Sequence, residues 1–433
     1  MRVPPLVVGG ATFIAALPLL LALPHLTGTG VSGWLQQAGQ ATGIAGTSCL
    51  LLAAVLSVRI PGLDTRLGGL TAVWRLHHLL GAAAFLLLMA HPLLLALSAA
   101  AVSPQASMSV LWPPLEDTKV WAGWVALLAM MIYLAPSFWF FGRPDYQRWK
   151  YLHLLSGVAL ILGLWHAVEL NRALPGIGGT LLWTGFGALA VAAFAYRVVL
   201  SRWLGPYRYR VAAVTPLARD VVEIALTPEA RPIRYNAGQF IYLRHFDPAL
   251  RPGYGEEHPY TIASSPLDEQ VRIGIKALGD ASAAMARISE GAPVTVEGPY
   301  GRFFPEGGAD TGQLWIGGGI GITPFVSRAR HLKAGQAACD VHLVYCANRP
   351  ERAYYSDQLR DIADTMPGFS FHMHYFNDQG PLSLQYLRSV CEDFDQRSIF
   401  ICGPGPMTDH ILRLMREAGV RRHRIHTEEF DLL

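Results

Sequence analysis

Residues 74–100 read WRLHHLLGAAAFLLLMAHPLLLALSAA. A stretch of this length and apolarity can cross a hydrocarbon core of about 30 Å, which takes about 20 residues of helix. Histidine is costly in hydrocarbon, so an intramembrane histidine indicates a functional group. The stretch carries three histidines, His77, His78 and His91. It therefore predicts a transmembrane helix with a ligand-binding role.

Five more stretches match it in length and apolarity. We expect helices over residues 5–26, 34–58, 74–99, 119–141, 149–170 and 179–200. No small-x-small cleavage motif follows the first stretch, so we expect it to be retained as a helix rather than removed as a signal peptide. With the N-terminus inside, the inner flanks carry nine basic residues and the outer flanks two: Arg2, Arg59, Arg66, Arg75, Arg143, Arg148, Lys150, Arg197 and Arg202 against Lys119 and Arg172. This bias predicts a cytoplasmic N-terminus and a cytoplasmic C-terminal half.

Composition divides the chain in the same way. Hydrophobic residues make up 52% and charged residues only 15%, which is unusual for a soluble protein. The apolar excess lies in residues 1–200, whereas residues 207–433 have an ordinary globular composition. The net charge of +3 gives no indication of nucleic-acid binding. Four of the five cysteines lie in the C-terminal half without paired or ligand-like spacing, which fits a reducing compartment.

The histidines occur as two pairs on two predicted helices. His77 and His91 are 14 residues apart, a rise of about 21 Å that returns to nearly the same helix face. The fifth stretch carries His153 and His166, and their 13-residue spacing places them about 140° apart unless the helix tightens locally. Two such helices facing each other can hold two stacked haems with an imidazole on each side of the iron. His78 competes with His77, which is the preferred ligand; histidines that only pack between helices are the alternative.

Small residues flank these histidines. Gly81, Gly157 and Gly163 lie on the same two stretches. They predict either room for a flat macrocycle or close packing of helices, and the sequence leaves both open.

From residue 207 the pattern changes to short β-like runs separated by turns, which predicts a small antiparallel barrel. Residues 258–266 read HPYTIASSP, and residues 275–280 read IKALGD. A flavin needs an aromatic wall, a hydroxyl near its redox edge and donors for its pyrophosphate, and these segments supply such groups.

A second nucleotide-binding pattern follows. The apolar run at 314–316 leads into GGGIGITPF at 317–325 and a helical pattern, which predicts a strand, a pyrophosphate-binding turn and a helix. VHLVYCANRPERAYYSDQL at 341–359 predicts a βα unit with two arginines in its turn, and ICGPGPM occupies 401–407. The sequence ends HTEEFDLL at 426–433.

With these motifs in this order, the C-terminal half resembles the ferredoxin–NADP reductase superfamily. Nearly the whole chain resembles the ferric reductase/NADPH oxidase family. The resemblance implies FAD binding by His258, Pro259, Tyr260, Thr261, Lys276, Gly279 and Asp280. It implies NADPH binding, with NADH as the alternative, by Gly317, Gly318, Gly319, Gly321, Thr323, Pro324, Arg349, Arg352, Cys402, Gly403 and Pro404. Thr261 would act near flavin N5, Cys402 beside the nicotinamide, and Phe430 as a ring stacked on the flavin.

We therefore expect an all-α six-helix transmembrane di-haem domain at 1–203, an antiparallel β-barrel FAD domain at 204–308 and an α/β Rossmann-like NAD(P) domain at 309–433. The expected activity is electron transfer from cytosolic NAD(P)H through FAD and two b-type haems across the inner membrane to O2 or a ferric chelate. The family's oxidases have a polar residue where Leu95 stands, which counts against a dedicated oxidase. The alternatives are a reductase subunit for a periplasmic partner protein and a non-catalytic haem-binding membrane protein.

Overall fold

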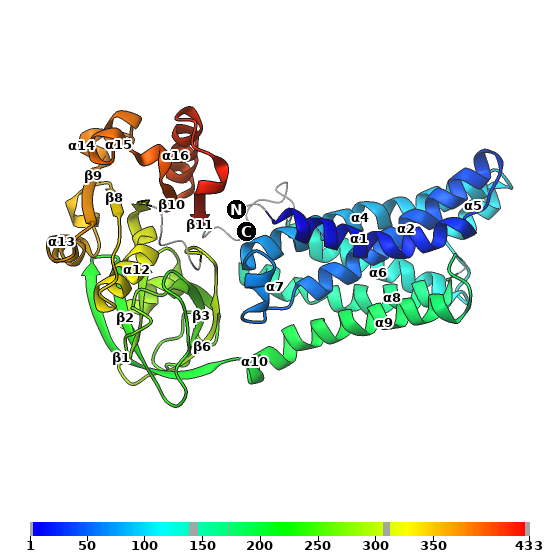
Figure 1. Cartoon of the computed structure of the whole chain (residues 1–433). Helices are drawn as coiled ribbons and strands as arrows, with labels where there is room; N and C mark the ends of the chain where they lie inside the picture. Colours follow the sequence, from blue (N-terminus) through cyan, green and yellow to red (C-terminus); the bar gives the residue numbers. More distant parts are fainter. Residues whose placement is uncertain (1–2, 138–145, 172, 306–311, 429–433) are drawn as a thin grey trace. The chain divides into compact units, whose positions relative to one another are not determined.

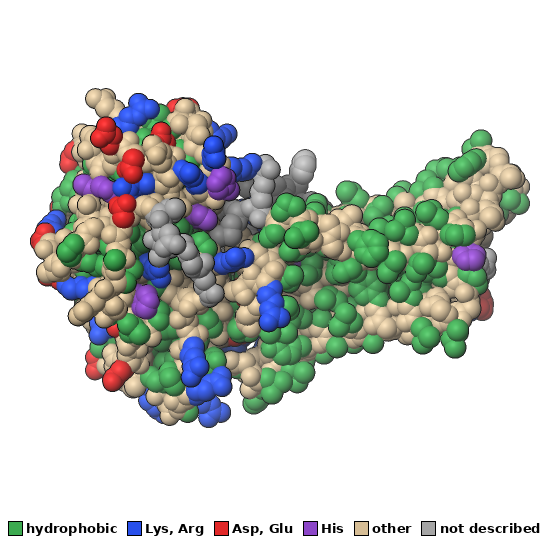
Figure 2. Space-filling view, in the orientation of Figure 1, with side chains coloured by type: hydrophobic (Ala, Val, Ile, Leu, Met, Phe, Trp, Pro, Cys, Tyr) green, Lys and Arg blue, Asp and Glu red, His purple; other side chains and the backbone are tan. Residues whose placement is uncertain are grey.

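The computed structural model describes residues 3–137, 146–171, 173–305 and 312–428. The chain forms two compact units, one of residues 2–59 and 72–202, the other chiefly of residues 60–71 and 203–433. In Figure 2, hydrophobic side chains cover the visible face of the helical unit, whereas charged side chains gather on the second unit. This contrast in surface chemistry matches a membrane-embedded unit and a water-exposed unit.

The helical unit is a bundle whose long helices run side by side (Figure 1). Its helices are α1 (Pro5–Ala22), α2 (Gly30–Leu56), α4 (Leu70–Ala100), α5 (Pro104–Leu111), α6 (Thr118–Leu134), α7 (Tyr146–His153), α8 (Ser156–Glu169) and α9 (Gly176–Ala195), which continues through a π-helical turn (Tyr196–Leu200) into α10 (Ser201–Leu204). Five segments are long and apolar enough to span a membrane: Pro5–His25, Gly30–Leu56, Leu70–Ala100, Trp149–Glu169 and Gly176–Leu204. The prediction of a multi-pass membrane protein is thus confirmed for these five segments.

The sixth predicted span is the exception. Its helix, α6, is apolar but has only 17 residues in the described part of the chain, and the end of the predicted span at residues 138–141 lies outside the described residues. A count of six transmembrane helices therefore stays a prediction.

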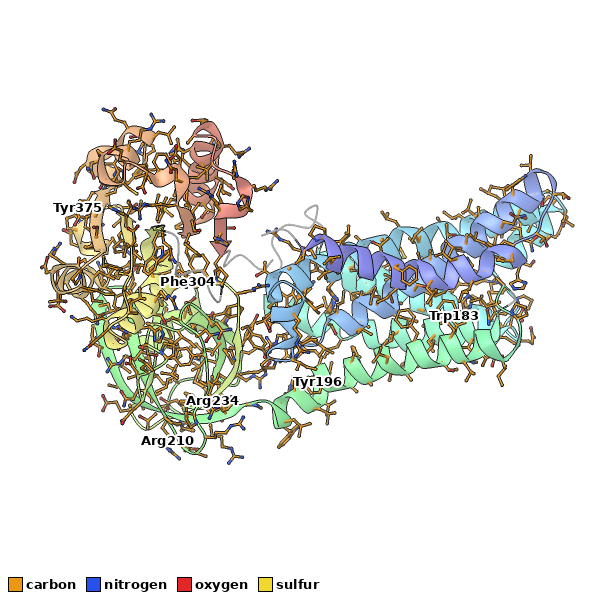
Figure 3. All side chains as sticks on the ribbon, viewed as in Figure 1. Trp183, Tyr196, Arg210, Arg234, Phe304 and Tyr375 are labelled. Atoms are coloured by element: carbon orange, nitrogen blue, oxygen red, sulfur yellow. The ribbon has the colours of Figure 1, made fainter. Side chains whose placement is uncertain are left out.

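Glycines on α2 allow it to lie close to α4. A Cβ atom on Gly39 would come within 2.7 Å of Leu95, and one on Gly46 within 2.7 Å of Leu88. Small residues at this spacing let two helix backbones approach inside a membrane, where no hydrophobic force drives them together. Aromatic residues fill wider gaps: Trp183 of α9 is 2% exposed and packs in the bundle core, and Figure 3 labels it on that helix together with Tyr196.

The second unit begins with a curled antiparallel sheet. Its strands are β1 (Tyr207–Ala218), β2 (Val221–Pro228), β3 (Phe240–His245), β4 (His258–Thr261), β5 (Val271–Lys276) and β6 (Pro293–Tyr300), in the order β4-β3-β6-β1-β2-β5. A bridge between Ile262 and Ile273 joins the two ends of this order, so the sheet closes on itself around an apolar core. The expected barrel-like FAD domain is confirmed.

A parallel sheet follows. Its strands are β7 (Gln313–Gly318), β8 (Val341–Ala347), β9 (Phe369–Tyr375), β10 (Ser398–Cys402) and β11 (Ile425–Glu428), in the order β11-β10-β7-β8-β9. The helices α12 (Thr323–Ala334), α13 (Ser356–Thr365), α15 (Leu384–Val390) and α16 (Gly405–Glu417) connect them. The strand order reverses at β7, and in such sheets ligands bind beyond the carboxyl ends of the strands near that switch. The expected α/β nucleotide domain is confirmed, while the predicted boundary at 308/309 lies outside the described residues.

Candidate functional site

Two histidine pairs lie inside the helical unit. The ring centres of His77 on α4 and His153 on α7 are 6.2 Å apart, and those of His91 on α4 and His166 on α8 are also 6.2 Å apart. All four side chains are partly buried. The structure thus brings together the four histidines that the sequence predicts, as one pair of His77 with His153 and another of His91 with His166.

A break in the fifth apolar segment explains how His153 and His166, which are 13 residues apart, can both face α4. Helix α7 ends at His153 and α8 begins at Ser156, with a turn at Leu154 and Leu155 between them. In this turn the backbone N–H groups of Leu155 and Gly157 donate to carbonyls three residues earlier, to Leu152 and Leu154. Such bonds wind the chain more tightly than an α-helix does. The turn therefore lets His153 and His166 both face α4.

The 6.2 Å spacing fits two imidazoles that bind one metal from opposite sides. An imidazole nitrogen lies about 2 Å from a metal it binds and about 1 Å from its own ring centre, so the two ring centres would be about 6 Å apart. In the described part of the chain no cluster of three or more His, Cys, Asp or Glu residues could hold a metal ion. Each pair can thus supply two axial ligands to a metal whose remaining ligands come from a macrocycle.

Three of the four histidines are hydrogen-bonded through Nδ1, which leaves Nε2 as the nitrogen that could bind a metal. The Nδ1 atom of His77 lies 2.8 Å from the Ala53 carbonyl, that of His91 2.7 Å from the Gly39 carbonyl, and that of His166 2.8 Å from the Lys119 carbonyl. A carbonyl can only accept, so Nδ1 carries the proton and Nε2 keeps its lone pair for a metal.

His153 differs from the other three. Its Nδ1 is buried without a hydrogen-bond partner among the described residues. Its ring stacks on Trp149, with centres 4.9 Å apart, and meets the ring of Tyr133 edge-on at 5.0 Å. His153 is therefore held by aromatic packing instead of a carbonyl.

The glycines that make room for the imidazoles lie on other helices than the sequence suggested. A Cβ atom on Gly43 of α2 would lie 2.7 Å from His91 Nδ1, and one on Gly123 of α6 would lie 2.7 Å from His166 Nδ1. The flanking Gly81 has open space beside it. Sequence reasoning missed Gly43 and Gly123 because glycine gives no sign of which helix it faces.

The flavin motif forms strand β4 and the residues after it. Thr261 ends this strand, is 5% exposed, and its hydroxyl has no hydrogen-bond partner among the described residues. A buried hydroxyl without a partner costs free energy, which a ligand that uses it would recover. His258 is more exposed and lies 3.3 Å from Glu256, while burial raises the pKa of Tyr260. This part of the sheet fits a bound flavin.

The predicted phosphate-binding segment lies beyond β5. Lys276 ends that strand, and Gly279 precedes the short helix α11 (Asp280–Ala284). The backbone N–H groups of Leu278 and Gly279 both donate to the Ser282 hydroxyl at 3.0 Å. A phosphate would have to replace this hydroxyl as the acceptor, and the role of the segment stays a prediction.

The glycine-rich and Cys-Gly-Pro segments meet at the carboxyl ends of β7 and β10. Gly317 pairs in register with Cys402. A Cβ atom on Gly321 would lie 2.6 Å from the Cys402 carbonyl oxygen, and one on Gly403 would lie 3.2 Å from the Gly318 backbone. Only glycine permits this approach of the two segments. They form one edge to which a dinucleotide can bind.

The remaining residues of this edge differ in exposure. Gly319 has a φ of +54° with open space beside it, whereas Thr323 and Pro324 are buried at the start of α12, where the Thr323 hydroxyl donates to the Ile320 carbonyl at 2.7 Å. Pro404 is the residue before α16. Gly319 therefore leaves the most room for a pyrophosphate beside the chain.

Cys402 is fully buried. Burial, and secondarily Glu428, raises the pKa of its thiol well above the usual range. Cys402 is thus a neutral thiol, suited to packing beside a nicotinamide and unsuited to nucleophilic chemistry.

Glu428 is a residue that sequence reasoning missed. It pairs in register with Cys402 on the neighbouring strand, is 6% exposed, and burial raises its pKa to about 8. Its Oε2 has no hydrogen-bond partner among the described residues. A carboxyl that is protonated at neutral pH next to Cys402 is a candidate proton donor or acceptor. Only its position in HTEEF, close to the ring of Phe430 that is expected to stack on the flavin, could have drawn attention to it. Phe430 itself lies outside the described residues.

The two arginines expected at the adenosine 2′-phosphate have different environments. Arg352 forms an ion pair with Asp220 of the β1–β2 turn, and the Tyr354 and Asp220 hydrogen bonds raise its pKa. The Arg349 side chain is 62% exposed, with Glu351 at 3.8 Å. Arg349 is therefore the better candidate for phosphate binding, whereas Arg352 joins the two domains of the unit.

This difference predicts unequal effects on cofactor use. We expect Arg349→Ala to raise KM for NADPH about tenfold, because a charge-assisted hydrogen bond to phosphate is lost. KM for NADH should be unchanged. Steady-state kinetics with both cofactors would check this, with Arg352→Ala as the matched control. A loss of NADPH selectivity in Arg352→Ala instead would contradict the assignment.

Three family models match the chain in order. The ferric reductase like transmembrane component matches residues 42–164, the FAD-binding domain residues 207–303, and the oxidoreductase NAD-binding domain residues 315–413. The chain has the ferric reductase/NADPH oxidase-type architecture. It combines a multi-pass membrane unit with domains that match FAD-binding and oxidoreductase NAD-binding families.

Individual proteins match parts of the chain at low sequence identity. The reductase component of propane 2-monooxygenase from Rhodococcus jostii is 26% identical over 239 residues, which are 52% of this chain and 63% of that protein. A flavohemoprotein from Bordetella pertussis is 26% identical over 304 residues, 64% of this chain and 74% of that protein. The chain thus spans less than two thirds of the length of the Rhodococcus reductase. A flavohemoglobin structure from Malassezia yamatoensis with bound FAD and haem has a TM-score of 0.50 at 19% identity, covering 93% of this chain and all of that one, a likeness of fold alone.

Proposed function

We propose that this oxidoreductase moves electrons from cytosolic NAD(P)H through FAD and two b-type haems to an acceptor on the far side of the membrane, O2 or a ferric chelate. The observation that carries the proposal is the spacing of the two histidine pairs, 6.2 Å in each case. Two pairs that share α4 and have the same distance between ring centres are not expected of histidines that only pack.

Each cofactor supplies one kind of chemistry when bound: FAD accepts two electrons as a hydride and releases them singly, and each haem iron carries one electron at a time. The chain would hold the haems through the Nε2 atoms of His77 and His153 and of His91 and His166. Two histidines of the chain would thus be committed to each haem, and each haem would supply one-electron transfer.

The second unit would orient the other two cofactors. Thr261 would donate its hydroxyl, which has no hydrogen-bond partner among the described residues, toward the reacting edge of the flavin. Glu428 would hold a proton beside the nicotinamide site, and Cys402 would pack against that site as a neutral thiol. The glycine edge of β7 and β10 would bind the pyrophosphate of NAD(P)H.

The distribution of Lys and Arg supports placing the His77–His153 pair toward the cytosol and the His91–His166 pair toward the outside. Near His166, the Lys119 ammonium group lies 3.3 Å from the Glu169 carboxylate, and both side chains are about half exposed. Leu95 lies against Gly39 of α2, so this position offers no polar group. Small apolar O2 needs no polar site, whereas the positive charge of Lys119, which could attract an anionic ferric chelate, is already paired with Glu169.

We would test the proposal with purified protein loaded with haem and FAD. NADPH oxidation in air would be scored for superoxide as dismutase-sensitive cytochrome c reduction. The same preparation under argon would be given ferric citrate. Faster superoxide production would identify an oxidase, and faster anaerobic iron reduction a ferric reductase. If neither NADPH nor NADH reduces either acceptor although flavin and haems are bound, the proposed function is wrong.

A further inference from the structure

The two outer imidazoles are held by the same local arrangement on two different helices. His91 Nδ1 donates to the carbonyl of Gly39, and Gly43 follows one turn later on α2. His166 Nδ1 donates to the carbonyl of Lys119, and Gly123 follows one turn later on α6. In an α-helix the carbonyl of residue i already accepts from the N–H of residue i+4. The imidazole therefore uses the second lone pair of that carbonyl.

Glycine at i+4 makes this second bond accessible. A Cβ atom on Gly43 would lie 2.7 Å from Nδ1 and 2.8 Å from Cε1 of His91, and Gly123 shows the same two distances to His166. Any side chain there would push the ring off the carbonyl. We call each arrangement a carbonyl–glycine clamp.

The other histidine pair has a different support. His77 donates to the Ala53 carbonyl at 2.8 Å, but the residue one turn later is Ser57, at the end of α2. His153 has no carbonyl partner among the described residues and rests on Trp149 and Tyr133. The angle between the two imidazole planes also differs between the pairs. It is 81° for His91 and His166 and 62° for His77 and His153.

We propose that the clamps make the two haem sites inequivalent, with the lower reduction potential at the His91–His166 site; this rests on the proposed function. An Nδ1–H bond to a carbonyl makes the imidazole a stronger electron donor, which stabilises the ferric form. Two such bonds support one site, whereas among the described residues a single such bond supports the other. A lower potential at the site nearest the acceptor gives each electron more driving force to reduce a weak oxidant. Gly43 and Gly123 are thus positioning residues.

The test uses the full-length protein with haem bound. Haem potentials would be measured by anaerobic titration followed in the visible spectrum, and ligand-plane angles by electron paramagnetic resonance of the ferric form. The variants are Gly43→Ala on α2 and Gly123→Ala on α6. Gly46→Ala is the matched control, because its Cβ would press on Leu88 at 2.7 Å without touching a histidine.

We expect two reduction waves in the wild type. Each clamp variant should move only the lower wave, and move it to a higher potential. The expected shift corresponds to a change of about tenfold in the equilibrium constant for haem reduction, which is the scale on which such supporting hydrogen bonds act. Each clamp variant should also alter only one of the two ferric signals. Gly46→Ala should lower the thermal midpoint and leave both waves in place.

Three outcomes would overturn the inference: a single wave for two bound haems, a clamp variant that moves both waves or neither, or the same spectral change in Gly46→Ala. Having one clamp on each of two helices keeps the test decisive if one variant does not fold. Absence of haem in the well-folded wild type would instead refute the proposed function, and the haem-to-protein ratio distinguishes the two failures.

Discussion

His77→Leu is expected to remove one of the two haems and to stop electron transfer beyond the flavin. Its ring lies opposite His153 at 6.2 Å, and its Nδ1 is fixed by the Ala53 carbonyl. Leucine fills a similar volume but offers no lone pair to iron. Reduction of the flavin by NADPH should continue, because that step takes place in the other unit. The measurements are haem content per chain and stopped-flow reduction of flavin and haem.

The adjacent histidine provides the matched control. His78 is exposed, and its ring lies 5.7 Å from that of His77 outside either pair. His78→Leu removes the same side chain from the same helix turn, and we expect it to keep both haems and full haem reduction. If His78→Leu loses the haem and His77→Leu keeps it, the ligand assignment is wrong.

Glu428→Gln is expected to abolish the pH dependence of flavin reduction near pH 8. Burial raises the pKa of this carboxyl to about 8, so it is protonated at neutral pH and becomes charged as the pH rises through that value. A buried negative charge beside the hydride site would oppose delivery of a hydride to the flavin. Flavin reduction in the wild type should therefore slow above pH 8, by about tenfold or more. The glutamine variant, which stays neutral, should show no such decline.

The pH dependence of folding stability provides a second measurement on Glu428, because its pKa differs between the folded and unfolded states. Glutamate in the unfolded chain has a pKa of about 4.3, so between that pH and about 8 the folded state binds more protons. The contribution of Glu428 to stability is therefore complete below the unfolded pKa and is lost as the pH rises through the folded one. Thermal midpoints should fall less over this range in Glu428→Gln than in the wild type. Glu417→Gln, at an exposed position on α16, is the control; an unchanged pH profile in Glu428→Gln would show that another group titrates.

The sequence by itself determined the elements and their order. Apolar length predicted the spans, short β-like runs separated by turns predicted the antiparallel sheet, and glycines after an apolar run predicted the edge of the parallel sheet. These signals are local, because each depends on residues within one helix or strand. The four paired histidines were also identified, since a polar ligand inside an apolar helix is conspicuous wherever the helix packs.

Tertiary structure alone decided which groups meet. Contacts between residues distant in the chain place Gly43 and Gly123 beside histidines of other helices, pair Arg352 with Asp220 and bury Glu428. A glycine, an arginine or a glutamate has the same local signature in many environments. Its role is set by the distance, burial and hydrogen-bond partners that packing imposes, and these determine ligand geometry, cofactor selectivity and proton affinity.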